Sequence, residues 1–206
     1  MILLHAVTRA LPDGADIDRM RARTAGSVTV LHEHVDGPPV ATRAAVVDHG
    51  RRIIRLAECR PVLPMRYGTT VDSVPELDAL IAEHAENWDR RLTAVDGHCE
   101  LLVHVDFPTD DDGDAAATGR EYLLRRSAQL RQRDQTWHAL EEVVRPSCRE
   151  TRALTDGRRL AVLVPRDDVD RLRSAVATWA SAHPDLRVAV TGPWPPFTFC
   201  EDPTGP

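Results

Sequence analysis

One segment near the middle of the chain carries four side chains of the types that bind metal ions. In residues 98–107 polar and apolar residues alternate, which predicts a β-strand with one apolar face. His98, Glu100, His104 and Asp106 share the other face. Because imidazole and carboxylate groups are common metal ligands, one interpretation is a metal- or small-ligand-dependent enzyme that uses this strand face.

The same pattern is typical of an ordinary half-buried strand, whose second face is solvated. Glu100 and His104 lie four positions apart, which is about 13 Å on a strand at roughly 3.3 Å per residue. His32 and His34 also share a face, but no third ligand lies near them in the sequence. We therefore expect polar solvent faces at both places, with no metal and no cofactor.

The remaining residues offer little catalytic chemistry. No serine lies in a Gly-x-Ser-x-Gly sequence, and the chain contains no lysine, which excludes a Schiff-base lysine and a P-loop lysine. The four cysteines are far apart in the sequence and form no CxxC pair, which argues against a zinc site or a redox dithiol. These observations favour a protein that is not an enzyme.

Charge and hydropathy exclude two classes of partner. The net charge is −6 and all 26 basic residues are scattered arginines, whereas nucleic-acid binding needs a clustered basic face. No run of about 18 apolar residues is present, so we predict no membrane span. Residues 1–7 lack a basic leader and are better explained as a strand than as a signal peptide, which predicts a cytoplasmic protein.

Hydrophobic periodicity predicts a small α+β domain in the first half of the chain. Its expected elements are a strand, a polar loop or short helix, a second strand and a helix, over residues 1–7, 13–23, 27–35 and 40–58. Ser73, Pro75 and Glu76 then form an N-cap signature. The helix that they open has apolar residues at three- and four-residue steps from Leu77 to Leu92.

The second half is predicted to contain six elements in the order strand, helix, strand, strand, helix, strand. They are expected over residues 98–107, 121–144, 148–154, 158–164, 169–182 and 186–190. This βαββαβ order is the ferredoxin-like arrangement, an antiparallel sheet with two helices on one face. The acidic run Asp110 to Asp114 is expected to be a solvated loop. The predicted organisation is thus two domains, residues 1–95 and residues 96–206.

Two segments combine prolines with aromatic residues. The later one, Gly192 to Phe199, follows directly on the last predicted strand. Proline fixes φ and donates no backbone hydrogen bond, so we expect a stiff, extended arm whose rings need a covering surface. The earlier one, Pro61 to Gly68, has the same character. An intramolecular clamp between the two halves is favoured over an exposed docking site, and Arg66 either pins its own segment or contacts a partner.

These segments resemble the gas vesicle accessory proteins of the GvpF/GvpL family. The family's "VLPxRFGT"-like and "TGPWPPYSF"-like motifs are similar to Val62–Thr69 and Thr191–Phe199 here, with Tyr67 where phenylalanine is more familiar. Residues 100–105 resemble its "E-x-x-V-K-V" strand, and residues 119–126 resemble its "G-x-x-Y-L-x-x-R" helix start. The resemblance covers most of the chain.

The resemblance implies a non-enzymatic accessory protein that binds the hydrophobic shell subunit and other accessory proteins during gas vesicle formation. It implies a gas vesicle-associated location in the cytoplasm. The surfaces expected to hold a partner are the predicted helix from Leu77 to Leu92 and the later proline segment. Partner-binding or structural roles are implied for Leu63, Pro64, Met65, Arg66, Tyr67, Gly68, Pro193, Trp194, Pro195, Pro196 and Phe197.

Two hypotheses from other classes stay open at this point. One is the enzyme on the His98, Glu100, His104 and Asp106 strand face. The other is a ferredoxin-like module that only self-associates through its sheet edges. The sequence also leaves open whether the chain is an F-type or an L-type member, its oligomeric state and the role of the acidic run.

Overall fold

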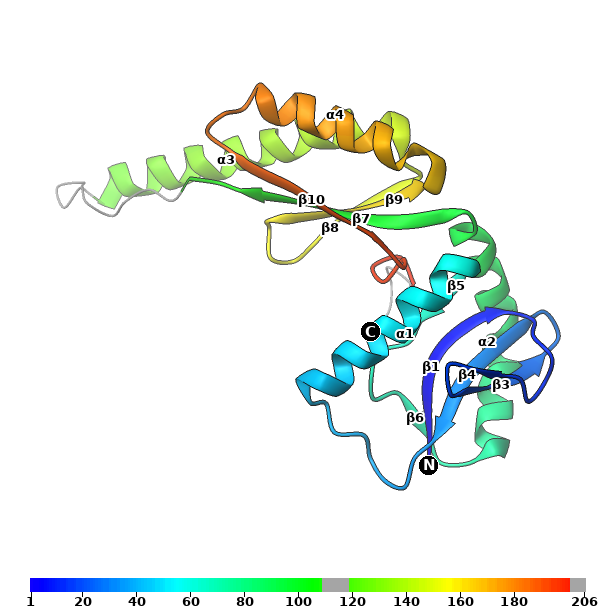
Figure 1. Cartoon of the computed structure of the whole chain (residues 1–206). Coiled ribbons are helices and arrows are strands. Elements are labelled where there is room, and N and C mark those ends of the chain that lie inside the picture. The colour runs from blue at the N-terminus through cyan, green and yellow to red at the C-terminus, as the bar shows by residue number, and fades with distance from the viewer. Residues whose placement is uncertain (109–118, 201–206) are drawn as a thin grey trace. The chain divides into compact units, whose positions relative to one another are not determined.

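Contacts divide the chain into two compact units. The computed structural model describes residues 1–108 and 119–200, so the acidic run lies outside the described residues. The units are Met1–Glu100 with Trp194–Pro206, and Leu101–Pro193. Each unit combines helices with a β-sheet (Figure 1), so the chain has the mixed α+β class that the sequence predicted. By its contacts the segment from Trp194 onward belongs to the first unit, whereas the sequence grouped it with the second.

The first unit is built on a six-stranded sheet. Its strands are β1 (Ile2–Arg9), β2 (Asp16–Ile17), β3 (Met20–Ala25), β4 (Val28–His34), β5 (Val62–Pro64) and β6 (Thr70–Val71). They are ordered β2-β3-β4-β1-β5, and β6 also pairs with β1. All of the pairings of β1 are antiparallel. Because β1 is the central strand, seven of its eight residues are buried.

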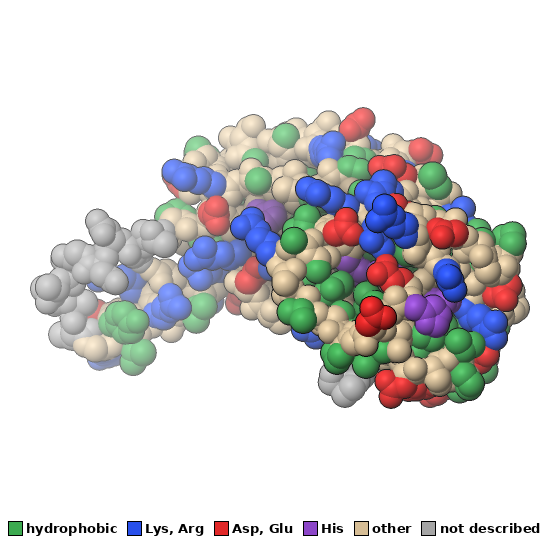
Figure 2. Space-filling model, turned by 60° about the horizontal axis from the view of Figure 1, so that its bottom comes forward, with side chains coloured by type: hydrophobic (Ala, Val, Ile, Leu, Met, Phe, Trp, Pro, Cys, Tyr) green, Lys and Arg blue, Asp and Glu red, His purple; other side chains and the backbone are tan. Residues whose placement is uncertain are grey.

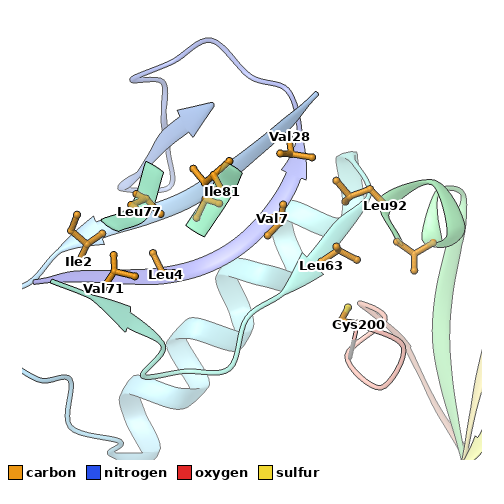
Figure 3. Close-up of a cluster of buried hydrophobic side chains, with 12 residues drawn as sticks. Ile2, Leu4, Val7, Val28, Leu63, Val71, Leu77, Ile81, Leu92 and Cys200 are labelled. Carbon is orange, nitrogen blue, oxygen red and sulfur yellow. The ribbon is translucent and has the colours of Figure 1, made fainter. Parts of the chain in front are cut away.

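Two helices of the first unit pack on the sheet through separate apolar clusters. The helices are α1 (Arg43–Cys59) and α2 (Val74–Val95). Leu4 of β1 joins Leu77 and Ile81 of α2 in one cluster (Figure 3). Ala6 of β1 joins Ile53 of α1 in the other. Full burial of each such aliphatic side chain stabilises the fold by roughly 1.5–3 kcal/mol.

A β-bulge in β1 determines which side chains reach α1. The register of β1 against β4 shifts between Leu4 and Ala6, so His5 is the extra residue. A bulge re-aims the side chains that follow it. His5 contacts a residue of α1, and Ala6 packs in the α1 cluster as its neighbour. The bulge therefore places two consecutive side chains toward the same helix.

The prediction of a loop or short helix over residues 13–23 was wrong. Most of β2 and β3 lies there, joined by a tight turn in which Asp18 and Arg19 have φ of 55° and 67°. Met20 is fully buried, and Arg23 donates to both carboxylate oxygens of Asp78 on α2 at 2.7 Å. This bidentate pair to a distant helix stabilises a polar strand that local propensity does not favour.

The helix α2 begins as the sequence predicted. The Ser73 hydroxyl accepts a hydrogen bond from Glu76 N at 3.3 Å, and the Glu76 carboxylate accepts one from Asp72 N at 2.8 Å. The first bond satisfies a backbone donor that the helix start leaves without an intrahelical partner, and the second holds the residue before the cap. The apolar face of α2 is used inside the unit, because Leu77 and Leu92 are completely buried.

The remaining elements lie mainly in the second unit. They are β7 (His98–Asp106), α3 (Gly119–Val144), β8 (Glu150–Ala153), β9 (Arg159–Pro165), α4 (Val169–Ser181) and β10 (Arg187–Trp194), with short 3-10 helices at Arg145–Ser147 and Arg166–Asp168. The first three residues of β7 and the last residue of β10 belong to the first unit. The strand order is β10-β7-β9-β8, and β8 and β9 form an antiparallel hairpin. In the described part of the chain, no helix has the length and apolar character needed to cross a membrane.

The N-cap of α2 provides a test of this local analysis. We expect Ser73→Ala to lower the free energy of unfolding by about 1 kcal/mol, because Glu76 N loses its acceptor. Ser174→Ala is the matched control, since the exposed Ser174 hydroxyl only donates to a carbonyl within α4. Urea denaturation followed by circular dichroism measures both. Equal effects of the two substitutions would contradict the assigned cap.

Candidate functional site

The earlier proline motif is built into the sheet of the first unit. Its residues Val62 to Pro64 form β5, and Leu63 pairs with Val7 of β1. Met65 N donates to the carbonyl of His5 at 2.9 Å, which continues the contact one residue past the strand. Proline is tolerated here because β5 is an edge strand of the sheet. The first residues of the motif therefore form an edge strand of the sheet.

A tight turn follows β5 and returns the chain to β1. Thr69 donates to the carbonyl of Arg66 through its backbone N at 3.1 Å and its hydroxyl at 2.8 Å. Gly68 has φ of +95°, a conformation that residues with a Cβ rarely adopt. The Thr69 carbonyl then accepts from Leu4 N at 2.9 Å. The turn leaves Arg66 exposed to solvent.

Two buried histidines connect this motif to β1 and α1. His5 is 2% exposed and His49 is 6% exposed, and their Nδ1 atoms are 3.0 Å apart. His49 Nε2 lies 2.9 Å from the Met65 carbonyl, and its ring lies edge-on to Tyr67. Because a carbonyl oxygen only accepts, Nε2 of His49 carries the proton and Nδ1 of the neutral ring accepts from His5.

That arrangement leaves the second nitrogen of His5 without a proton. His5 Nε2 makes no hydrogen bond, although it lies 3.5 Å from the carboxylate of Glu33. Glu33 instead accepts from Arg52 of α1 at 2.8 Å. Burial, followed by the positive field of His49, lowers the pKa of His5 from 6.5 to about 4. Burial also lowers the pKa of His49, so both rings are neutral at pH 7.

The later proline motif differs from the expected extended arm. Strand β10 continues through Gly192 and Pro193 to Trp194, and Arg173 of α4 donates to the Gly192 carbonyl at 2.7 Å. After Trp194 the chain folds into a compact turn, in which Phe199 N donates to the Pro196 carbonyl at 3.1 Å. Proline disfavours a continuing strand but readily begins a turn, which explains the difference.

The rings and prolines of this motif divide into buried and exposed sets. The buried residues are Pro195, Pro196, Phe199 and Cys200. Pro193 is exposed, Trp194 is 36% exposed and Phe197 is 41% exposed. One set thus anchors the turn, while the other faces solvent.

The carboxylate of Glu100 holds the turn in place. Glu100 lies on β7 and is only 2% exposed. One of its oxygens accepts from Thr198 N at 2.7 Å, and the other accepts from the Thr198 hydroxyl at 2.8 Å. Both lie in the first unit as the contacts define it. Charge-assisted bonds of this kind are about twice as strong as neutral ones.

The two motifs contribute to the same apolar cluster. Leu63 of the earlier motif and Cys200, at the end of the later turn, are members of one cluster with the α2 face (Figure 3). Cys200 Sγ donates to the Pro196 carbonyl at 2.8 Å. Segments that are about 130 residues apart in the sequence therefore stabilise one core.

The proposed metal face on β7 does not form a cluster of ligands. Glu100 is directed to Thr198, whereas Asp106 is exposed at the far end of the strand. His98 and His104 are half-buried, and His98 Nδ1 lies 2.6 Å from the Asp96 carbonyl. Among residues 1–108 and 119–200, no group of three or more His, Cys, Asp or Glu residues could hold a metal ion. Period-two alternation found the shared face but could not show that Glu100 is buried.

A hollow of about 380 Å³ lies beside α1 in the first unit. Arg52, Arg55 and Arg60 line it together with apolar side chains. Two of these arginines are already neutralised, because Arg52 pairs with Glu33 and Arg55 pairs with Asp18. The exposed Cys59 also lies in the lining, and the described lining residues include no histidine.

The fold defines an α+β protein of two units, in which the earlier proline motif and the later one from Trp194 onward belong to the first unit. The family model described as "Gas vesicle synthesis protein GvpL/GvpF" matches residues 4–201. The chain therefore belongs to the GvpL/GvpF family of gas vesicle synthesis proteins.

Individual relatives agree with this assignment. The chain is 30% identical over 171 residues to gas vesicle protein F2 of Halobacterium salinarum, covering 79% of this chain and 71% of that protein. It is also 30% identical over 224 residues to gas vesicle protein L of a Streptomyces species, covering 95% and 79% respectively.

Solved structures agree on the fold. The crystal structure of the gas vesicle protein GvpF from an Anabaena species superposes with a TM-score of 0.80 over 98% of both chains, at 15% identity. That of GvpF from Microcystis aeruginosa gives 0.76 over 97% of this chain and 98% of that one, also at 15% identity.

The Glu100 anchor can be tested by a conservative substitution. We expect Glu100→Gln to lower the free energy of unfolding by about 1–3 kcal/mol, because one side-chain oxygen is replaced by an amide donor that faces the donors of Thr198. We also expect faster chymotrypsin cleavage after Phe199. Asp106→Asn on the same strand is the control, because Asp106 is exposed. Unchanged stability and cleavage for Glu100→Gln would contradict the anchor.

The buried histidine pair predicts acid sensitivity. Because the pKa of His5 is lowered in the folded state, the unfolded chain binds more protons between pH 6.5 and about 4. The stability contribution of the neutral ring is therefore complete above pH 6.5 and is lost as the pH falls toward about 4. Urea titrations at several pH values measure this slope.

Substitution of the ring separates this slope from other titrations. We expect His5→Leu to flatten the dependence of the unfolding free energy on pH in that window. His138→Leu, at an exposed position of α3, should leave the slope as in the parent protein. Identical slopes for His5→Leu and the parent protein would show that the buried pair is not responsible.

Proposed function

We propose that this chain is a non-enzymatic accessory protein that binds the hydrophobic shell subunit, and other accessory proteins, during gas vesicle formation in the cytoplasm. Membership of the GvpL/GvpF family is the observation that carries the proposal. A shell subunit exposed to water would aggregate, so a protein that covers its apolar surface until assembly would have a direct physical role.

We further infer that the second unit is a ferredoxin-like module. The element order β7-α3-β8-β9-α4-β10 supports this, as does the strand order β10-β7-β9-β8, in which the first and third strands are neighbours. In a module of this kind the two helices bury the apolar face of the sheet. Domain boundaries near residue 95 remain a prediction.

The exposed residues of the two motifs are the proposed contact points for the shell subunit. Arg66, Trp194 and Phe197 are exposed, and arginine and large aromatic residues are enriched at the energetic centres of protein interfaces. The buried motif residues, such as Leu63 and Pro196, would hold the backbone that carries these exposed side chains. The face of α2 from Leu77 to Leu92 is not proposed, because its apolar side chains are buried within the unit.

Co-expression with the shell subunit tests this function. We expect the chain to move a large share of shell subunit from the pellet to the soluble fraction, in a complex that survives size-exclusion chromatography. The double variant Trp194→Ala/Phe197→Ala should reduce this share several-fold. Because both rings are more than half buried, circular dichroism is used to establish that the variant is folded. Densitometry of both fractions measures the effect.

A matched control distinguishes contact from general surface change. Val40→Ala/Val74→Ala removes exposed apolar atoms elsewhere in the first unit, at residues that are 73% and 39% exposed. This variant should solubilise shell subunit as the parent chain does. The proposed function fails if the parent chain leaves the shell subunit in the pellet. The proposed contact points fail if the two double variants behave alike.

A further inference from the structure

The N-terminal half of α3 presents several large apolar side chains that are exposed. Tyr122, Leu123 and Leu124 are 61%, 64% and 59% exposed, and Leu130 is 48% exposed. Large aliphatic side chains at this level of exposure, gathered within nine residues, are unusual on a protein surface. Three of them, Tyr122, Leu123 and Leu124, lie in the segment 119–126 that resembles the family's helix start. None of the three belongs to the buried core.

These side chains continue a stripe that packs against the protein further along the same helix. Leu123, Leu130, Trp137 and Val144 follow one another at seven-residue steps, which keeps them within about 20° per step on one face. Val144 is completely buried and Trp137 is half-buried, with its ring against Phe107 at a centroid distance of 6.0 Å. Burial then declines toward the start of the helix.

The physical reason is the length of α3. It has 26 residues, which is about 39 Å at 1.5 Å per residue, whereas α4 beside it has 13. In Figure 1 the first half of α3 extends past the end of α4. The stripe therefore runs on beyond the neighbouring helix α4, although it has one apolar position per seven residues where a coiled-coil seam has two.

Arginines outnumber acidic residues around the stripe. Residues 119–134 contain five arginines, one glutamate and one aspartate, in a chain whose net charge is −6. Figure 2 shows arginine and hydrophobic side chains intermixed at this end of the molecule. A basic rim around an apolar seam is complementary to a helix that carries leucine-like residues on one face and acidic residues beside them.

We propose that the N-terminal half of α3 is a docking site for an acidic amphipathic helix of a partner protein. Leu123 and Leu130 form the centre of the contact, and Arg125 and Arg126 provide its basic rim. The site uses other residues than the contact points proposed for the shell subunit. Binding of the partner helix and binding of the shell subunit can therefore be tested independently of one another.

Two other occupants fit the observations less well. A second copy of this chain would bring ten arginines together on facing helices, and like charges at such a seam repel. A lipid surface requires a broad apolar face, whereas between residues 125 and 136 only Ala128 and Leu130 are apolar and Asp134 lies beside the stripe. The apolar contact is narrow, with one apolar residue per seven along the stripe, so the arginines would supply much of the recognition of a partner helix.

A designed peptide measures the proposed chemistry directly. The probe is a fluorescein-labelled helix of about four heptads, with leucine at the seam positions and glutamate beside them. We expect saturable binding to the full chain by fluorescence anisotropy, and weaker binding at higher salt. A second peptide with lysine in place of every glutamate should bind at least about tenfold more weakly, because its charges face the arginines.

Variants of the full chain locate the binding. Leu123→Ser/Leu130→Ser and Arg125→Glu/Arg126→Glu should each weaken the acidic peptide by about tenfold or more. Val46→Ser/Val47→Ser is the matched apolar control, since both residues are exposed on α1, and Arg171→Glu on α4 is the charge control. Circular dichroism establishes that each variant is folded. Both controls should bind as the parent chain does.

Three results would overturn the proposal. The first is an absence of saturable binding of the acidic peptide, or binding that the Leu123 and Leu130 substitutions do not weaken. The second is binding of anionic phosphatidylglycerol vesicles that these substitutions abolish, which would assign the stripe to a membrane surface. The third is self-association in analytical ultracentrifugation that the same substitutions abolish, which would assign it to a second copy.

Discussion

The first unit depends on a buried carboxylate whose hydrogen-bond donors come from nearly 100 residues away in the sequence. A carboxylate as buried as Glu100 costs several kcal/mol of desolvation unless its lone pairs are satisfied. Thr198 supplies a backbone and a hydroxyl donor together. Because neither donor is in reach unless the later proline motif is folded, the carboxylate makes that motif part of the first unit.

Other contacts join distant segments of the first unit in the same way. The turn that Thr198 anchors places Cys200 in the cluster that contains Leu63, so both proline motifs stabilise one core. On the opposite side of β1, the bulge at His5 directs an imidazole to α1, where His49 and the Met65 carbonyl satisfy one another.

The parts of the fold that local chemistry determines could be predicted from the sequence. The cap at Ser73 depends only on its next three residues, and the hairpin at Gly157 depends on a φ of 62° that glycine adopts freely. Strand β3 was missed because a partner on α2 stabilises it. Glu100 was assigned to a solvent face because alternation shows only which side chains share a face. Its burial depends on Thr198, which is distant in the sequence. The exposed seam of α3 was missed for a similar reason, since its buried and exposed halves have the same periodicity.

Native-state hydrogen exchange at the Thr198 amide tests the central claim most directly, because this single N–H reports whether Glu100 holds the later motif in the core. The account predicts that the amide exchanges only through unfolding of the first unit, with a protection free energy close to that of the amides of β1, and that Glu100→Gln removes most of this protection. Exchange of Thr198 at the rate of an open loop in the parent protein would contradict it.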